Sequence, residues 1–256
     1  VFSALWFLIF ALPVLFAVPE LPGTRQGAGL GFLASYGLLV RRIKAIYRTS
    51  PHTIYFLLAS AVFRDGLAAV FTFGGIIAAG TFGFELKEVI FFAIFGNVVA
   101  AVGAVLGGLL DDRIGPKAVI TGSLVGLLTA GSMILVLGND NHSFLGMEWA
   151  GTTTFWIFGL FLCLFVGPAQ SSSRAYLARL APAGQEGELF GLYATTGRAG
   201  SFLEPELFAM SIALAKPYVD DAQRYGILGI ILVLLLGLAL LLPVHAPGRL
   251  GVEQPA

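Results

Sequence analysis

Two long apolar runs separated by one short charged segment constrain this chain more than any other feature. The runs cover residues 89–106 and 118–137. Each approaches the ~20 residues that a helix needs to cross the core of a bilayer. The segment between them, residues 107–117, reads GGLLDDRIGPK. Gly115 and Pro116 within it favour the end of one helix and the start of the next. The pattern therefore predicts two membrane-spanning helices joined by a tight, charged hairpin.

The composition extends this prediction to the whole chain. Of its 256 residues, 57% are hydrophobic and 12% are charged, which is about half the charged share of a soluble domain. Because the apolar runs are continuous rather than alternating, we expect an all-α membrane protein. The net charge of zero gives no indication of a nucleic-acid partner. Cys163 is the single cysteine and the histidines lie near the ends of the runs, so we expect no metal site and no cofactor.

Seven membrane spans are predicted from the apolar runs. They cover residues 1–18, 53–79, 86–110, 118–137, 149–170, 189–215 and 226–242. A short surface helix is expected near residues 32–47, and a polar turn at residues 139–142. Small residues allow neighbouring helices to pack closely in a membrane. The glycines expected to do so are Gly74, Gly75, Gly103, Gly107 and Gly108.

The basic residues orient these spans, because cytoplasmic loops carry an excess of lysine and arginine. If the hairpin at residues 107–117 is cytoplasmic, the outer loops hold only Lys87, Lys216 and Arg224. The inner loops and the tail then hold Arg25, Arg41, Arg42, Lys44, Arg48, Arg113, Lys117, Arg174, Arg179 and Arg249. We therefore expect the chain to begin outside and to end in the cytoplasm.

The hairpin resembles the characteristic loop of transporters of the major facilitator superfamily, whose pattern is roughly G-x-L-x-D-R-x-G-R-K. The matching positions are Gly108, Asp112, Arg113, Gly115 and Lys117. Pro116 stands where that family usually has a basic residue. In the family this loop recurs once in each six-helix half and stabilises one state of the transport cycle. The resemblance therefore implies a conformational loop at the cytoplasmic helix ends.

A second stretch resembles the vacuole-effluxer-like branch of the superfamily, whose eukaryotic members are associated with amino-acid export. It covers residues 167–193 and includes a cytoplasmic motif formed by Gln170, Ser173 and Arg174. Residues 63–66, Phe-Arg-Asp-Gly, also resemble the start of the seventh helix in that branch. Two positions depart from the branch: Asn97 replaces an expected glutamine, and Glu204, before Pro205, replaces an expected glycine.

The resemblance also implies a domain order. Residues 1–18 correspond to the sixth helix of a full transporter, and residues 19–52 to the cytoplasmic linker between its halves. Residues 53–243 form the C-terminal six-helix bundle, and residues 244–256 a cytoplasmic tail. We accordingly expect a fragment that lies in a bacterial cell (inner) membrane. Its expected partners are the lipid bilayer, a missing N-terminal half and a small-molecule substrate.

Polar side chains inside the predicted spans are candidates for a substrate or proton site, because they are unfavourable in a membrane unless they face an interior or a cavity. They are Arg64, Asp65, Asn97, Arg198 and Glu204. The alternative for each is a structural role between helices. Counted at ~1.5 Å per residue from the cytoplasmic helix ends, Asp65 and Arg198 lie at a similar depth. We therefore expect these two side chains to form an ion pair.

Together these patterns favour a secondary active transporter that moves a small solute by alternating access. The resemblance implies amino acids as the solute, and the intramembrane charges suggest coupling to protons. A seven-helix receptor or sensor is the alternative, since the predicted topology fits one, although no lysine lies in the middle of the last span to hold retinal. An intramembrane enzyme is not expected, because neither G-x-S-x-G nor H-E-x-x-H occurs in the sequence.

Overall fold

The structure, a computed structural model, describes residues 2–17, 32–140, 142–144, 147–181 and 185–245. It divides into two units, residues 1–45 and residues 46–256. The first unit holds the apolar helix α1 (Phe2–Ala17) and most of α2 (Phe32–Thr49). The short helix expected near residues 32–47 is therefore present as α2. The part of the predicted linker that precedes α2, residues 19–31, and most of the predicted tail lie outside the described residues.

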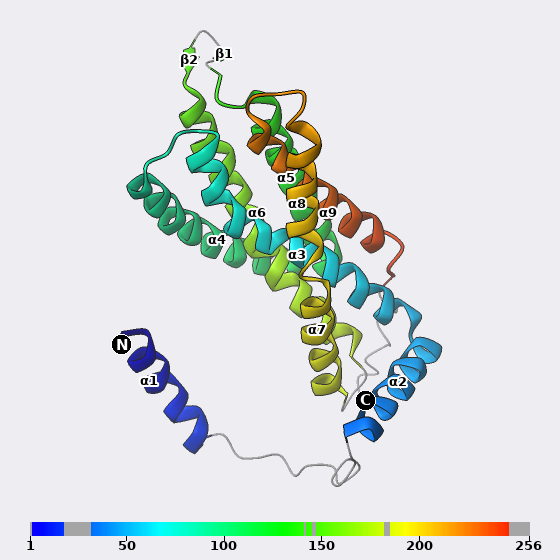
Figure 1. Ribbon diagram of the computed structural model, residues 1–256. Coiled ribbons are helices and arrows are strands. Elements are labelled where there is room, and N and C mark those ends of the chain that lie inside the picture. The colour runs from blue at the N-terminus through cyan, green and yellow to red at the C-terminus, as the bar shows by residue number, and fades with distance from the viewer. Residues whose placement is uncertain (1, 18–31, 141, 145–146, 182–184, 246–256) are drawn as a thin grey trace. The chain divides into compact units, whose positions relative to one another are not determined.

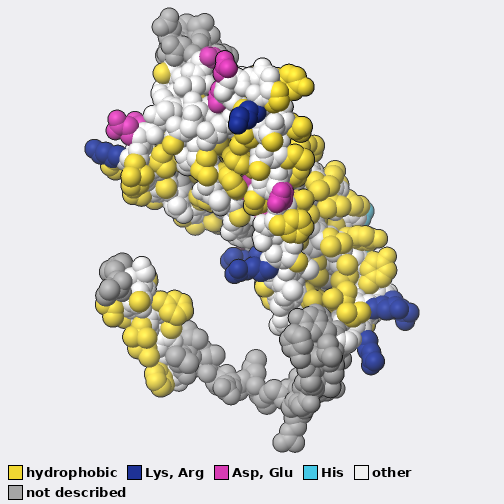
Figure 2. All heavy atoms as spheres, in the orientation of Figure 1, with side chains coloured by type: hydrophobic (Ala, Val, Ile, Leu, Met, Phe, Trp, Pro, Cys, Tyr) yellow, Lys and Arg dark blue, Asp and Glu magenta, His cyan; other side chains and the backbone are white. Residues whose placement is uncertain are grey.

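The second unit consists mainly of long apolar helices (Figure 1). Among the residues that the structure describes, five helical segments are long and apolar enough to cross a membrane, judged by length and composition. They are α3 (Pro51–Gly80), α4 (Leu86–Ile114), α5 (Pro116–Leu137), α6 (Gly151–Leu180), and η2 (Ala222–Tyr225) continued by α9 (Gly226–Leu241). Hydrophobic side chains cover most of the face seen in Figure 2. These helices confirm the all-α membrane fold.

The predicted span over residues 189–215 is not one helix. It is divided into α7 (Glu186–Gly200) and α8 (Leu203–Ala215), with a break at Ser201 and Phe202. Pro205 explains the position of the break, because proline has no N–H for the carbonyl four residues earlier and its ring clashes with that carbonyl. The carbonyl concerned belongs to Ser201. The Ser201 hydroxyl instead donates to the Arg198 carbonyl oxygen over 2.9 Å, which satisfies one of the carbonyls at the end of α7.

A short antiparallel hairpin joins α5 to α6. β1 (His142–Phe144) pairs with β2 (Met147–Trp149), and His142 lies opposite Trp149. The sequence predicted only a polar turn at residues 139–142 and a helix that starts at Trp149. Trp149 is the last extended residue of the hairpin, and α6 begins at Gly151, within two residues of the predicted start. The predicted end at residue 170 was wrong, because α6 continues to Leu180 and includes Arg174 and Arg179, which were expected in a loop.

The helices of the second unit pack closely where glycines meet their neighbours. α6 packs against α4 and α5, and α9 against α3, α5 and α8. A Cβ at Gly103 of α4 would meet the carbonyl oxygen of Leu164, and one at Gly107 would meet Pro168. The predictions for Gly74 and Gly108 were wrong, because no atom of a neighbouring element lies within 4 Å of either Cβ position. Gly108 is one residue beyond Gly107, which turns it by about 100° away from α6.

Candidate functional site

A polar cavity of about 500 Å³ lies between α3, α6 and α7 of the second unit. It collects most of the charged residues that the sequence predicted inside the spans. α3 contributes Arg64 and Asp65, α6 contributes Gln170 and Arg174, and α7 contributes Arg198. Figure 2 shows lysine and arginine side chains gathered beside α7 on a face that is otherwise mostly apolar. The remaining lining residues are Ala68, Tyr193, Ala194, Gly197 and Ser201.

Arg64 is held in the cavity wall by Tyr193. Its guanidinium carbon lies 3.9 Å from the centre of the Tyr193 ring, and Nη1 donates to the Tyr193 carbonyl oxygen over 3.0 Å. The Tyr193 hydroxyl is fixed in turn by the buried Ser173 hydroxyl, at 2.7 Å. Gly197 leaves room for the guanidinium, since a Cβ there would lie 2.8 Å from Nη1. An arginine held in this way keeps its remaining N–H donors for a ligand.

Asp65 is bound by the break between α7 and α8 rather than by an arginine. Its side chain is only 8% exposed, and its Oδ2 accepts a hydrogen bond of 2.8 Å from the backbone N–H of Glu204. The carboxylate thus lies at the N-terminus of α8, where free N–H groups and the helix dipole favour a negative charge. Within the described residues no ion pair joins Asp65 to Arg198. The expected ion pair is therefore absent, but both side chains line the same cavity.

Glu204 lies in the first turn of α8, outside the set of residues that line the cavity. Its side chain is 2% exposed, and Oε1 has no hydrogen-bond partner in the described part of the chain. An ionised carboxylate buried without a partner is strongly unfavourable. The buried position of Glu204 therefore favours the neutral, protonated form of its carboxyl group.

Arg174 and Arg198 present guanidinium groups that the protein leaves available. Both side chains are exposed and line the cavity. Neither forms an ion pair or a side-chain hydrogen bond among the residues that the structure describes. Guanidinium groups bind carboxylates and phosphates through two parallel hydrogen bonds. The cavity can therefore hold an anionic group, with the Gln170 amide as a further hydrogen-bonding group.

Asn97 is the one predicted candidate that lies away from this region. It is exposed on α4, and its side-chain amide donates to the carbonyl oxygen of Ala93 over 2.8 Å, within its own helix. It does not line the polar cavity. The hydrogen bond within its own helix satisfies the Asn97 amide. A polar residue inside a predicted span therefore did not, in this case, indicate a residue of the site.

The predicted conformational loop forms the turn between α4 and α5. Gly115 has a φ of 85°, a left-handed value that favours glycine, and it is the single residue between the two helices. Lys117 Nζ donates to the Leu242 carbonyl oxygen over 2.7 Å. Asp112 and Arg113 are exposed.

Asp111 is the acid of this loop that the helix bundle buries. It is 6% exposed, and its Oδ1 has no hydrogen-bond partner within the described residues. The family pattern favoured Asp112 instead. The sequence could have indicated this difference, because Asp111 and Asp112 are adjacent at the end of a helix. Adjacent residues point about 100° apart around a helix, so only one of the two acids can face the bundle.

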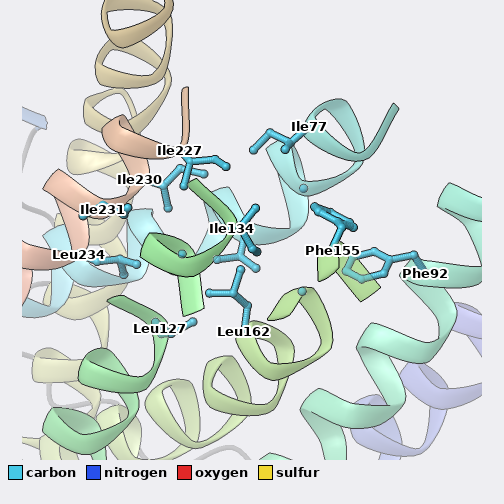
Figure 3. A pocket seen from close by; sticks show the side chains of 14 residues that line it. Ile77, Phe92, Leu127, Ile134, Phe155, Leu162, Ile227, Ile230, Ile231 and Leu234 are labelled. Atoms are coloured by element: carbon cyan, nitrogen blue, oxygen red, sulfur yellow. The ribbon is translucent and has the colours of Figure 1, made fainter. Parts of the chain in front are cut away.

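A second cavity of the second unit is apolar (Figure 3). Its volume is about 40 Å³, and side chains such as Ile77, Leu127 and Ile230 line it without any charged group. A cavity of this size and lining is a packing defect between helices. The polar cavity is therefore the candidate functional site.

Sequence reasoning did not single out Tyr193 and Gly197 as site residues. Their spacing could have predicted that they lie together, because residues four apart in the sequence lie on the same face of a helix. Tyr193 and Gly197 share one such row, and Ala194 and Arg198 share the next. A helix face that carries one arginine and several small residues leaves space next to the charge.

Comparisons with known proteins agree with this architecture. A profile of the family described as "Vacuole effluxer Atg22 like" matches residues 1–248. Autophagy-related protein 22 of Cryptococcus neoformans is 25% identical, over 98% of this chain and 45% of that protein. A protein of Bacillus subtilis described as the uncharacterized MFS-type transporter YxiO is 23% identical, over 98% of this chain and 54% of that protein. The chain thus spans about half the length of the curated relatives it matches.

A solved structure shows the same fold. The inward-open xylose transporter XylE from E. coli superposes with a TM-score of 0.57 at 20% identity. The match covers 77% of this chain and 48% of that protein. None of the relatives named here is described as a receptor or an enzyme, so the receptor alternative gains no support from them.

Proposed function

Because the chain belongs to the vacuole effluxer Atg22-like family of the major facilitator superfamily, we propose that it is part of a secondary active transporter for a small solute. Transporters of this kind bind their substrate near the bilayer midplane and open to one side at a time. The observation that supports the proposal is the polar cavity between α3, α6 and α7, within a bundle that is otherwise apolar.

Amino acids are the solute class that fits this cavity. Arg174 and Arg198 offer donors for a carboxylate, and Asp65 places a negative charge in the same wall for an ammonium group. A volume of about 500 Å³ lies within the range of small-molecule sites. The relative from Bacillus subtilis supports a bacterial cell membrane as the location.

Uptake by purified protein tests this function. The complete gene product that carries the chain would be reconstituted in liposomes, and the entry of radiolabelled amino acids would be followed with time and concentration. We expect saturable uptake, and we expect Arg64→Gln to reduce it at least about tenfold, because the substitution removes a cavity charge that Tyr193 holds in place. Arg48→Gln, at an exposed arginine in the last turn of α2, is the matched control. Folded protein without saturable uptake of any amino acid would contradict the proposal.

We further propose that Glu204 carries the coupling proton. Its carboxyl is buried beside Asp65, and release of its proton requires α8 or α3 to move so that water reaches it. Of the other elements that pack against α8, α9 contains no titratable side chain. η2 holds Arg224, whose guanidinium lies against Gly138, and Tyr225. Asp65 is therefore the charged group that faces Glu204.

The variant Glu204→Gln separates proton coupling from substrate binding. We expect it to lose uptake driven by a pH gradient and to keep exchange of internal for external substrate, because exchange needs no net proton movement. Glu206→Gln, at an exposed residue of the same helix, should behave like the unmodified protein. Gradient-driven uptake by Glu204→Gln at the unmodified rate would refute this role.

A further inference from the structure

The polar cavity carries more positive than negative charge. Its wall contains the guanidinium groups of Arg64, Arg174 and Arg198 and one carboxylate, that of Asp65. Oδ2 of Asp65 accepts the Glu204 N–H at the start of α8, and the carboxylate counts once against the three guanidinium groups. The described residues around the cavity therefore leave two guanidinium charges uncompensated.

We propose that the ligand of this cavity carries two anionic carboxylate groups, as an acidic amino acid or a small dicarboxylate does; this inference rests on the transport function proposed above. A neutral zwitterion brings one carboxylate and one ammonium group, so it would leave the excess charge as it is. A cavity whose wall carries excess positive charge attracts anionic ligands, so a ligand that brings two negative groups gains binding energy there. Two carboxylates match the number of uncompensated guanidinium groups.

The positions of the arginines fit a ligand with two separate anionic ends. Arg174 lies on α6 and Arg198 on α7, so the two charges reach the cavity from different helices. Each guanidinium presents a planar fork that fits one carboxylate. Arg64 is oriented by the Tyr193 ring and carbonyl, and its remaining donors line the same wall. A single carboxylate would engage only part of this set of donors.

A binding experiment on the detergent-purified complete gene product tests the charge preference. The dissociation constants of L-glutamate, succinate, L-leucine and L-lysine would be measured by isothermal titration calorimetry at low ionic strength. We expect glutamate or succinate to bind at least about tenfold more tightly than leucine, and lysine to bind most weakly. If acidic side chains from outside these 256 residues neutralise the cavity, leucine will bind as tightly as glutamate, and the inference is wrong.

Glutamate and succinate together distinguish an acidic amino acid from a dicarboxylate as the ligand. Glutamate and succinate both carry two carboxylates, but only glutamate has an ammonium group that Asp65 can attract. Tighter binding of glutamate identifies an acidic amino acid, and equal or tighter binding of succinate identifies a dicarboxylate. Both results support the inference, whereas a preference of neither over leucine overturns it.

Substitutions at Arg198 link the preference to this cavity. We expect Arg198→Gln to weaken glutamate binding at least about tenfold, and Arg198→Lys to weaken it less, because lysine keeps the charge without the planar fork. Arg48→Gln should leave the dissociation constant unchanged. Unchanged glutamate binding by a folded Arg198→Gln protein would overturn the assignment. If the protein takes up leucine saturably and shows no preference for acidic solutes, the proposed ligand class is wrong but the transport function stands. If the protein binds glutamate but takes up no solute, the transport function is wrong but the ligand class stands.

Discussion

At the scale of single residues, one aromatic side chain determines the geometry of the cavity. Tyr193 packs its ring against the Arg64 guanidinium, accepts a hydrogen bond from it through its carbonyl oxygen, and bonds to Ser173 through its hydroxyl. The carbonyl contact survives any substitution at position 193. The ring and the hydroxyl can therefore be tested separately.

We expect Tyr193→Leu to weaken substrate binding more than Tyr193→Phe does. Phenylalanine keeps an aromatic face for Arg64 and loses only the hydroxyl bond to Ser173, whereas leucine also loses the cation–π contact, which contributes about 0.5–2 kcal/mol. Dissociation constants of the two purified variants would show the difference. Equal losses in both would indicate that the hydroxyl, not the ring, positions Arg64.

The sequence predicted the members of the site better than their contacts. Arg64, Asp65 and Arg198, which the sequence predicted inside the spans, line one cavity, as expected for charges that are stable only at a shared polar interior. Gln170 and Arg174, which were predicted as part of a cytoplasmic motif, line the same cavity. The partner of Asp65 was missed because it is a backbone N–H. A backbone donor becomes free only where a helix begins, and that depends on where the neighbouring helix breaks.

At the scale of helices, the sequence predicted the long apolar elements and missed the interruption. A continuous apolar run sets the length of a span, so the positions of α3, α4 and α5 follow from composition. Pro205 was visible in the sequence, but hydropathy does not register a proline inside an apolar run. The break at Ser201 and Phe202 follows from the backbone sterics of a single residue, Pro205, whereas hydropathy is averaged over many residues.

Helix packing can be tested at two glycines with different surroundings. Gly74 lines the apolar cavity, and a Cβ there would meet no atom within 4 Å, so we expect Gly74→Ala to raise stability by about 0.5–1 kcal/mol. A Cβ at Gly103 would meet the carbonyl oxygen of Leu164, so Gly103→Ala should destabilise the α4–α6 contact. Thermal unfolding in detergent would show shifts of opposite sign. A rise in the unfolding temperature for Gly103→Ala would contradict the packing described here.

At the scale of the whole molecule, the greater length of the relatives leads us to expect that the isolated chain does not transport on its own. The chain spans about half of each curated relative it matches, and alternating access requires two bundles that move around a common site. We therefore expect these 256 residues, reconstituted alone, to show no saturable uptake of any amino acid. The complete gene product is the positive control in the same liposome assay, and robust saturable uptake by the chain alone would contradict the expectation.

The interruption between α7 and α8 has a mechanical consequence. α7 packs against α3 and α6, whereas α8 packs against α9 and η2 as well as α3. A continuous helix would transmit a bending force from one end of the span to the other, but two segments joined at Ser201 and Phe202 concentrate the deformation in a few backbone torsions. α7, which carries Arg198, can therefore reorient at this break relative to α8, which carries Glu204, so the two ends of the span need not deform at the same moment.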